Sequence, residues 1–289
     1  MIDQYIYNKN LESKPLSGLY LIATPIGNMK DITIRALELI KNIDFLYCEN
    51  PKQSAKILHN FNLKRSLHTY NDHSNAKLRE KIINLIKDNH SIGLISDAGT
   101  PTISDPGYKL VKTVQEHKLD VFSIPGACAA ITALSCSGMP TNTFHFIGFP
   151  PRKTLQLNNF LSNLQQYQGS LIFYETANRI KQFFTVAKDI FPHCDCFVAK
   201  ELTKLYEEKF SDNVNNIYLR LKDKPNLKGE FVILIYNRTE EKNVTFEKNL
   251  NRIVSVGKKY LPLKDFSKLL SEITNLNKNE IYKLAIKNK

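Results

Sequence analysis

The segment Ser96-Asp97-Ala98-Gly99-Thr100-Pro101-Thr102-Ile103-Ser104-Asp105-Pro106-Gly107 decides how the rest of the chain is interpreted. It continues directly from the apolar run 91–96, which predicts a buried strand. Two prolines, two glycines and two aspartates are more restriction than a generic turn needs, and small residues let a backbone approach a ligand closely. We therefore expect a ligand-binding loop that follows a strand.

Two other loops have the same character. The apolar run Gly18 to Ala23 predicts a strand and ends in Thr24-Pro25-Ile26-Gly27-Asn28, while 121–124 predicts a strand that ends in Pro125-Gly126. A helix of small residues, 127–138, follows the second loop. Its free N–H groups can bind an acceptor, and close packing against the sheet explains its alanines equally well. All three loops follow strands, and the carboxyl ends of parallel strands form the ligand crevice of such folds.

Strands alternate with helices over residues 18–124. We expect a helix from Asp31, as its N-cap, through Ile40, a strand at 43–48, and helices at 53–61 and 75–89. This alternation predicts an α/β domain with a parallel, doubly wound sheet.

The second half, 125–238, has a less regular order of elements and is expected to be a separate α+β domain. Its strand candidates are 144–149, 171–174, 196–200 and 231–236. A polar stretch at 239–245 is typical of a linker. The tail, 245–289, predicts one helix from Asp265 to Ile273 and a second from Lys278 to Ala285, a small helix-turn-helix-like hairpin.

The chain of 289 residues has a net charge of +12, which favours a polyanionic partner, although a general compositional bias toward lysine explains it equally well. Residues 241–289 carry eleven Lys or Arg and five Asp or Glu, so this segment supplies six of the twelve charges. A solvated basic end is the alternative, but charge concentrated on a helical hairpin favours RNA contact.

Several classes of protein are disfavoured. The five cysteines fit neither a disulfide framework nor a zinc site, which is typical of a reduced, cytoplasmic protein. The seven histidines lack metal-ligand spacing, so no metal is expected, and the glycine-rich signatures of common nucleotide cofactors are missing. The most apolar stretch, 124–139, is too short for a membrane span and is interrupted by Pro125 and Gly126.

Charged residues at the ends of second-half strands are candidates for substrate contacts. They are Lys153, Glu175, Arg179, Lys200 and Glu201. Surface salt bridges are the alternative for each of them. In the first half, Asp97 is expected either to contact a ligand or to brace its loop, and Asp105 to cap the following helix.

Seven ordered motifs between Gly18 and Tyr236 resemble the ribosomal RNA small-subunit methyltransferase I family of the tetrapyrrole methylase superfamily. These motifs are Leu21-Ile-Ala-Thr-Pro-Ile-Gly-Asn28 with Asp31-Ile-Thr-Ile-Arg-Ala36, the segment 96–107, Ile124-Pro-Gly126, Gly148-Phe-Pro-Pro-Arg-Lys153, Phe173-Tyr-Glu175, Glu201-Leu-Thr-Lys204 and Gly229-Glu-Phe-Val232. The tail at 261–286 also resembles the family's helix-turn-helix.

The resemblance implies a two-domain class III methyltransferase, usually a homodimer, that binds S-adenosylmethionine in its inter-domain cleft. It implies 2′-O-methylation of a cytidine in the RNA of the small ribosomal subunit. The implied cofactor contacts are Pro25, Gly27, Asp97, Ala98, Gly99, Thr100, Ile103, Pro125 and Gly126. Our candidates for handling the acceptor proton are Glu175, Lys200 and Glu201, and those for holding RNA are Arg152, Lys153 and Arg179.

The sequence departs from the family pattern at three places. Asn50-Pro51-Lys52 replaces an acidic-Thr-Arg sequence, Ala127-Cys128 replaces Pro-Ser, and Thr176-Ala177-Asn178 replaces Ser-Pro-His. These changes affect substrate handling rather than the cofactor loops. Two alternatives therefore stay open: a methylase of a tetrapyrrole or other small molecule on the same fold, and a non-catalytic RNA-binding relative.

Overall fold

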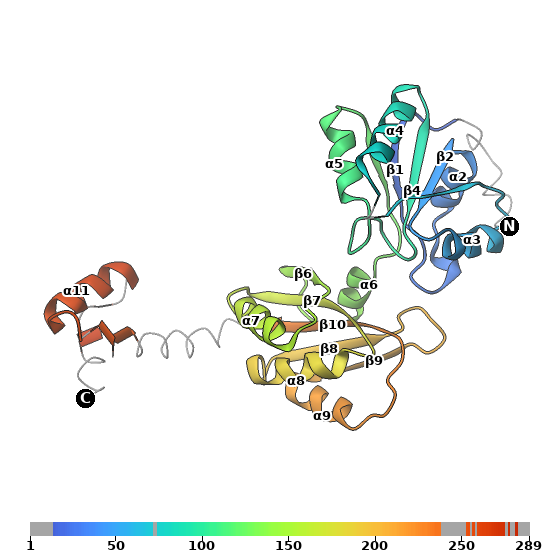
Figure 1. Ribbon diagram of the computed structural model, residues 1–289. Helices are drawn as coiled ribbons and strands as arrows, with labels where there is room; N and C mark the ends of the chain where they lie inside the picture. The colour runs from blue at the N-terminus through green and yellow to red at the C-terminus, as the bar shows by residue number, and fades with distance from the viewer. Residues whose placement is uncertain are drawn as a thin grey trace.

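The computed structural model describes residues 14–71, 74–237, 253, 254, 256, 257, 259–274, 277, 281 and 282. These residues form two five-stranded sheets, and the chain passes from the first to the second after β5 (Figure 1). No helix in this part of the chain is long and apolar enough to cross a membrane.

The first sheet is parallel throughout and has the strand order β3-β2-β4-β1-β5. Its strands are β1 (Gly18–Ile22), β2 (Phe45–Cys48), β3 (Leu67–Thr69), β4 (Ser91–Ile95) and β5 (Val121–Ile124). Two helices pack on each face: α2 (Ile34–Asn42) and α3 (Pro51–Asn60) on one, α4 (Ala76–Lys87) and α5 (Tyr108–Glu116) on the other. The predicted parallel, doubly wound sheet is confirmed.

Alternation of side chains along β1 explains why both faces of this sheet are covered. Leu19 lies in the core beneath α4 and α5, whereas Tyr20 and Ile22 lie in the core beneath α2 and α3. Because successive side chains of a strand point to opposite faces, a continuous apolar run requires helices on both sides.

Two helix starts differ from the prediction. A short 3-10 helix, η1 (Met29–Asp31), precedes α2, which is capped by Thr33, whose hydroxyl accepts the Ala36 N–H at 3.2 Å. Asp31 is therefore not the cap. Nor does Asp105 cap α5, because the N-cap position is taken by Gly107, whose φ of +133° no capping side chain could adopt readily.

The second sheet has the order β6-β7-β10-β8-β9, and of its pairs only β6 and β7 run parallel. Its strands are β6 (Phe144–Gly148), β7 (Gly169–Thr176), β8 (Asp195–Lys200), β9 (Glu208–Asn213) and β10 (Glu230–Asn237). The helices α7 (Thr154–Leu164), α8 (Ile180–Ile190) and α9 (Val214–Lys222) cover one face. The other face carries α6 (Ala129–Cys136), on the side of the first domain (Figure 1).

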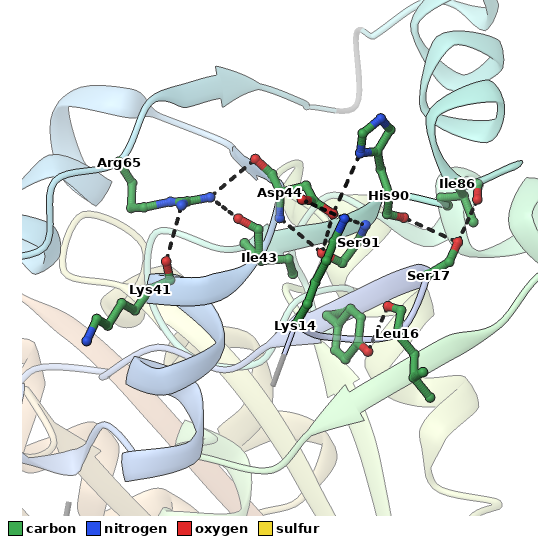
Figure 2. A network of polar contacts seen from close by, with 11 residues as sticks. Lys14, Leu16, Ser17, Lys41, Ile43, Asp44, Arg65, Ile86, His90 and Ser91 are labelled. Atoms are coloured by element: carbon green, nitrogen blue, oxygen red, sulfur yellow. Dashed lines mark hydrogen bonds and ion pairs between the residues drawn. The ribbon is translucent and has the colours of Figure 1, made fainter. Parts of the chain in front are cut away.

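A polar network fixes the amino ends of the first sheet (Figure 2). The Asp44 carboxylate accepts the Ser91 N–H at 2.8 Å and hydroxyl at 2.9 Å and lies 3.3 Å from the Lys14 ammonium. Burial opposes ionisation there, but these partners outweigh it and lower the pKa of Asp44. Ser17 donates to the Ile86 carbonyl, and Arg65 donates to the carbonyl of Asp44. The polar groups at this end of the sheet thus stabilise the fold, and the carboxyl ends of the strands remain for binding a ligand.

The described part of the tail has a small core of its own, built by Val254, Phe266, Leu270 and Ile281. Its helix, α11 (Leu263–Thr274), includes the predicted range from Phe266 to Ile273. The linker 239–245 and most of the second predicted helix lie outside the described residues, so the hairpin stays a prediction.

Candidate functional site

A cavity of about 210 Å³ lies between the two domains. The first domain contributes the loops that follow β1 and β4, and the second contributes the start of α6, the ends of β7 and β8 and the start of β10. The lining residues are Ile26, Ala98–Thr100, Ile103–Asp105, Cys128, Ala129, Phe149, Tyr174–Thr176, Ala199, Glu201, Leu202, Lys204 and Glu230–Val232.

The three loops singled out in the sequence do meet. Thr24 and Gly99 exchange both backbone hydrogen bonds, at 2.8 and 3.0 Å, and the Thr100 hydroxyl donates to the Ala127 carbonyl at 3.1 Å. Gly99 has a φ of +83°, and a β-carbon there would lie 3.3 Å from Ile26. The backbone of Gly99 is therefore held in a conformation, and in a space, that favour glycine.

The residues predicted to contact a cofactor fall into two groups. Ala98, Gly99, Thr100 and Ile103 line the cavity. The others, Pro25, Gly27, Asp97, Pro125 and Gly126, are not among its lining residues. A β-carbon on Gly126 would lie 2.7 Å from that of Ala23, so this glycine lets two loops pack closely.

Asp97 braces its loop. Its carboxylate accepts the Asn50 N–H at 3.2 Å, and burial raises the pKa of Asp97, with that hydrogen bond offsetting only part of the rise. Asn50, where the family pattern has an acidic residue, caps α3 by accepting the Lys52 N–H at 3.1 Å. The departure at this position thus preserves the local structure, because asparagine is a good cap.

Glu175 and Arg179 form a buried ion pair at the end of β7. One Glu175 oxygen lies 3.2 Å from Arg179, and the other accepts the Thr176 N–H at 2.8 Å. Only 1% of the Glu175 side chain is exposed, and burial raises the pKa of its carboxyl, an effect that the Thr176 N–H and Arg179 only partly offset. Arg179 also donates to the carbonyls of Pro150, at 2.7 Å, and Pro151, at 3.2 Å. The Arg179 guanidinium, which we predicted to bind RNA, is thus occupied by Glu175 and by two backbone carbonyls of its own chain.

A second charged cluster lies on the cavity wall at the end of β8. The Lys204 ammonium is 2.8 Å from both the Glu201 and the Glu230 carboxylates, and Glu201 also accepts the Glu230 N–H at 2.9 Å. Burial alone would raise the pKa of Glu201, but Lys204 and that N–H lower it. Burial would likewise lower the pKa of Lys204, but the two carboxylates raise it. Lys204 is therefore a cation at neutral pH.

Sequence reasoning placed Lys204 in a motif but did not assign it a role. It chose Lys200 instead, which is not among the lining residues and lies 3.8 Å from Glu208 on the edge strand β9. In the structure, a β-carbon on Gly27 would lie 2.5 Å from the Lys204 stem, so the first domain leaves room for that side chain. Arg152 and Lys153, the remaining candidates, are exposed just beyond the cavity.

Backbone strain is also concentrated at the cavity. Thr102, Ser104, Glu201 and Thr203 all have positive φ, between +50° and +75°. Such conformations cost roughly 1–3 kcal/mol each outside glycine and persist where the surroundings enforce them, often at functional sites. Ser104 and Glu201 both line the cavity, and Asn28 of the first domain donates its N–H to the Thr203 hydroxyl at 3.1 Å. No group of three or more potential metal ligands occurs among the described residues.

Fold and cavity together define a protein with two sheet-based domains and a cavity between the parallel sheet and the mixed sheet. Residues 18–217 match the family model of the Tetrapyrrole (Corrin/Porphyrin) Methylases. Ribosomal RNA small subunit methyltransferase I of Rickettsia prowazekii (strain Madrid E) is 42% identical over 78% of this chain and 81% of that protein. The protein of that name from Buchnera aphidicola subsp. Acyrthosiphon pisum (strain APS) is 37% identical over 93% of this chain and 96% of its own length.

A solved structure of diphthine synthase superposes with a TM-score of 0.59 at 12% identity, covering 75% of this chain and 89% of that one, which shows a shared fold. The chain belongs to the tetrapyrrole methylase family and, within it, to the ribosomal RNA small-subunit methyltransferase I family that the sequence motifs resemble. It is an S-adenosylmethionine-dependent methyltransferase, and the predicted fold class and enzyme class are confirmed.

The cavity residues fit this cofactor. Ile26, Gly99 and Ile103 offer an apolar cradle that a side chain at Gly99 would narrow. The cofactor supplies an activated methyl group when it is bound. The protein's own task is then to align an acceptor and to accept its proton.

Proposed function

We propose that this chain methylates the ribose 2′-hydroxyl of a cytidine in small-subunit ribosomal RNA. The observation that carries the proposal is the identity of 37% over nearly the full length of a relative named for that RNA. The net charge of +12 and the basic segment 241–289 add support, because cations concentrate a polyanion. The nucleotide and its 2′-oxygen come from the family resemblance.

The cofactor would occupy the cradle at Ala98, Gly99, Thr100 and Ile103. We place Pro25, Gly27, Asp97, Pro125 and Gly126 behind that cradle, where they shape and brace the loops. The first group lines the cavity and the second does not, and in the second group Gly27 and Gly126 permit close contacts with Lys204 and Ala23. Methyl transfer is an in-line displacement, so a rigid cradle contributes mainly by fixing the approach of the acceptor oxygen.

We propose that Glu175 accepts the proton that the ribose hydroxyl loses. A ribose hydroxyl is a poor nucleophile and has to lose its proton as the oxygen–carbon bond forms. Glu175 is one of the residues that line the cavity, and burial raises the pKa of its carboxyl, so it is a better base than an ordinary exposed glutamate. Arg179 would act through Glu175 as a positioning residue.

The Glu201–Lys204 pair would serve the acceptor oxygen. Two carboxylates hold the Lys204 ammonium at the cavity wall, from which it can donate a hydrogen bond and steady developing negative charge. Glu201 orients this lysine. Lys200, which pairs loosely with Glu208, is left as a candidate for the RNA-facing rim together with Arg152 and Lys153.

We further propose a cytoplasmic homodimer. The α6 face of the second sheet exposes apolar side chains near its edge: Ile131 is 50% exposed, Phe144 42% and Phe146 36%. Exposed apolar patches of this kind often mark an interface. Light scattering of the purified protein tests the dimer: a monomer at micromolar concentration contradicts it.

The experiment that tests the proposed function uses small ribosomal subunits isolated from cells without this activity. Incubation with the protein and labelled S-adenosylmethionine should place one methyl group on a ribose, mapped by resistance to alkaline cleavage. Label on a base, or label on added tetrapyrrole but not on RNA, would overturn it. Binding of the subunits without any transfer would favour the non-catalytic alternative.

A further inference from the structure

Phe149 is an aromatic side chain that lines the cavity yet remains 53% exposed. It follows β6 directly and stands at the mouth of the site. Large apolar side chains in such positions are usually either buried by their own chain or kept for a ligand. The surroundings of Phe149 decide between these two explanations.

A row of aromatic rings supports Phe149 from behind. Its ring meets that of Tyr174 edge-on, with centroids 5.6 Å apart, and Tyr174 meets Phe146 in the same manner at 5.1 Å. The Tyr174 hydroxyl is itself fixed, because it accepts the Ala130 N–H at 3.0 Å. Edge-to-face contacts are favourable, and the 53% exposure of Phe149 shows that about half of this side chain remains available.

The backbone that carries Phe149 is held on both sides. On one side, Gly148 has a φ of +71°, and a β-carbon there would lie 2.9 Å from the Ser104 hydroxyl of the first domain. On the other, Arg179 binds the carbonyls of Pro150 and Pro151. An exposed phenylalanine on a loop with two prolines, an arginine clamp and a close inter-domain contact is pre-organised, which reduces the entropy that a ligand would have to remove.

We infer that Phe149 is a stacking platform for a nucleobase, which holds the target nucleotide so that its ribose enters the cavity. The inference rests on the proposed function, since it names how that RNA is held. RNA is read mainly through unstacked bases that lie on aromatic side chains, with cations on the adjoining phosphates. Arg152 and Lys153, three and four residues beyond Phe149, are exposed and supply such cations. This reassigns Arg179 from contacting phosphate to fixing the platform.

The chain contains no tryptophan, so a single introduced indole reports on one place. Phe149→Trp keeps an aromatic platform and adds that probe. The matched control is Leu155→Trp, because Leu155 is 74% exposed on α7 and does not line the cavity. Each protein is saturated with S-adenosylhomocysteine and then titrated with a ten-nucleotide single-stranded RNA that has a central cytidine, and with the same RNA made abasic at that position.

The cytidine RNA should quench the indole emission of Phe149→Trp strongly and that of Leu155→Trp little, and the abasic RNA should quench neither. In the parent protein we expect the abasic RNA to bind about 5- to 150-fold more weakly, which corresponds to about 1–3 kcal/mol for one stacked base. In Phe149→Ala that difference should vanish, whereas Phe149→Tyr should retain it.

Four results would overturn the platform, three of them from the binding experiments. In the first, the difference in affinity between the two RNAs persists in Phe149→Ala. In the second, the indole emission of Phe149→Trp responds fully to S-adenosylhomocysteine alone. In the third, that emission changes with protein concentration alone, which would mean that the ring contacts a second copy of the chain. Methylation of ribosomal subunits by Phe149→Ala at the parent rate would remove the platform and leave the proposed function intact. If the parent protein binds neither RNA and methylates no subunits, both fall together.

Discussion

The two domains build their halves of the cavity by different means. The first supplies backbone: Gly99 pairs with Thr24 through main-chain hydrogen bonds, and the loop depends on a residue without a side chain. The second supplies charged side chains, above all the buried Glu175–Arg179 pair and the Lys204 ammonium between two carboxylates. A substitution in the first half therefore alters shape, and one in the second alters charge.

This difference has a physical consequence for stability. Backbone hydrogen bonds between loops are neutral, and their contribution varies little with pH. A buried ion pair behaves otherwise, because removal of one partner leaves a charge in a medium that solvates it poorly. The second half should accordingly be the more sensitive to single substitutions and to pH.

The largest effect is expected from Arg179→Ala. The Glu175 side chain is only 1% exposed, so the substitution strands a buried carboxylate and should lower the free energy of unfolding by about 3–5 kcal/mol at neutral pH. Because burial already raises the pKa of Glu175, protonation relieves the stranded charge, and the loss should shrink as the pH falls from 8 toward 5. Urea unfolding at several pH values measures this.

Arg220→Ala is the matched control for that experiment. Arg220 pairs with Glu208 at 3.1 Å and lies 4.0 Å from the centroid of the Phe210 ring, but its side chain is 45% exposed, so its removal should lower the free energy of unfolding by only about 1–2 kcal/mol. Equal losses for the two arginine variants, or a loss at Arg179 that does not depend on pH, would contradict the account of a buried pair.

The next effect concerns rate. Glu175→Gln preserves the shape of the cavity but removes the proposed proton acceptor, and single-turnover transfer should slow by roughly 30- to 1000-fold, equivalent to about 2–4 kcal/mol. Cofactor affinity should change little. Single-turnover assays with saturating RNA measure the effect. Glu208→Gln, on the outer edge strand β9, is the control and should keep the parent rate. A parent-like rate for Glu175→Gln would return Glu175 to a purely structural role.

The same contrast explains what the sequence could and could not predict. The apolar runs at β1 and β4 and the prolines and glycines after them are local signals, so the parallel sheet and its three loops followed from pattern alone. β3 and β9 were missed, since one has three residues and the other, Glu208–Asn213, is polar and becomes a strand only by pairing with β8. Boundaries of the three predicted domains stay predictions.

Side-chain partners were the harder part. Charge and position placed Glu175 and Arg179 near the site, but the sequence did not indicate that Arg179 binds the carbonyls of Pro150 and Pro151, 29 and 28 residues earlier. Lys200 and Lys204 are four residues apart, and a sharp turn with positive φ at Glu201 and Thr203 decides which of them reaches the cavity. Non-glycine residues rarely adopt that conformation, so pattern reasoning had no basis for it.

A smaller effect should follow Gly99→Val. At φ +83° a β-branched residue is strained by roughly 1–3 kcal/mol, and its side chain would crowd Ile26 in the cradle. Calorimetry should show cofactor affinity reduced at least about tenfold, or about 1.4 kcal/mol. Gly138→Val is the control, because Gly138 has a φ of +71° but nothing within 4 Å of an added β-carbon. It should lose similar stability and keep its affinity; equal affinities in the two folded variants would remove Gly99 from the cofactor site.

The smallest effect is a pH-dependent one at Glu201. The pKa of this carboxyl is lowered in the folded chain, so its contribution to stability is present above the usual glutamate range, roughly pH 4, and is lost as the pH falls through the folded value. The pKa of Lys204 is raised, so its share persists up to roughly pH 10.5 and is lost above it. Glu201→Gln should therefore cost about 1 kcal/mol between roughly pH 5 and 10, and this cost should shrink as the pH falls through the folded pKa of Glu201. Asp223→Asn, at a carboxylate 86% exposed, should cost nothing throughout. A loss at Glu201 that is the same at pH 3 and pH 7 would mean that packing against Gly229, rather than charge, holds this side chain, and the contrast between a backbone half and a charged half would then fail at its most exposed pair.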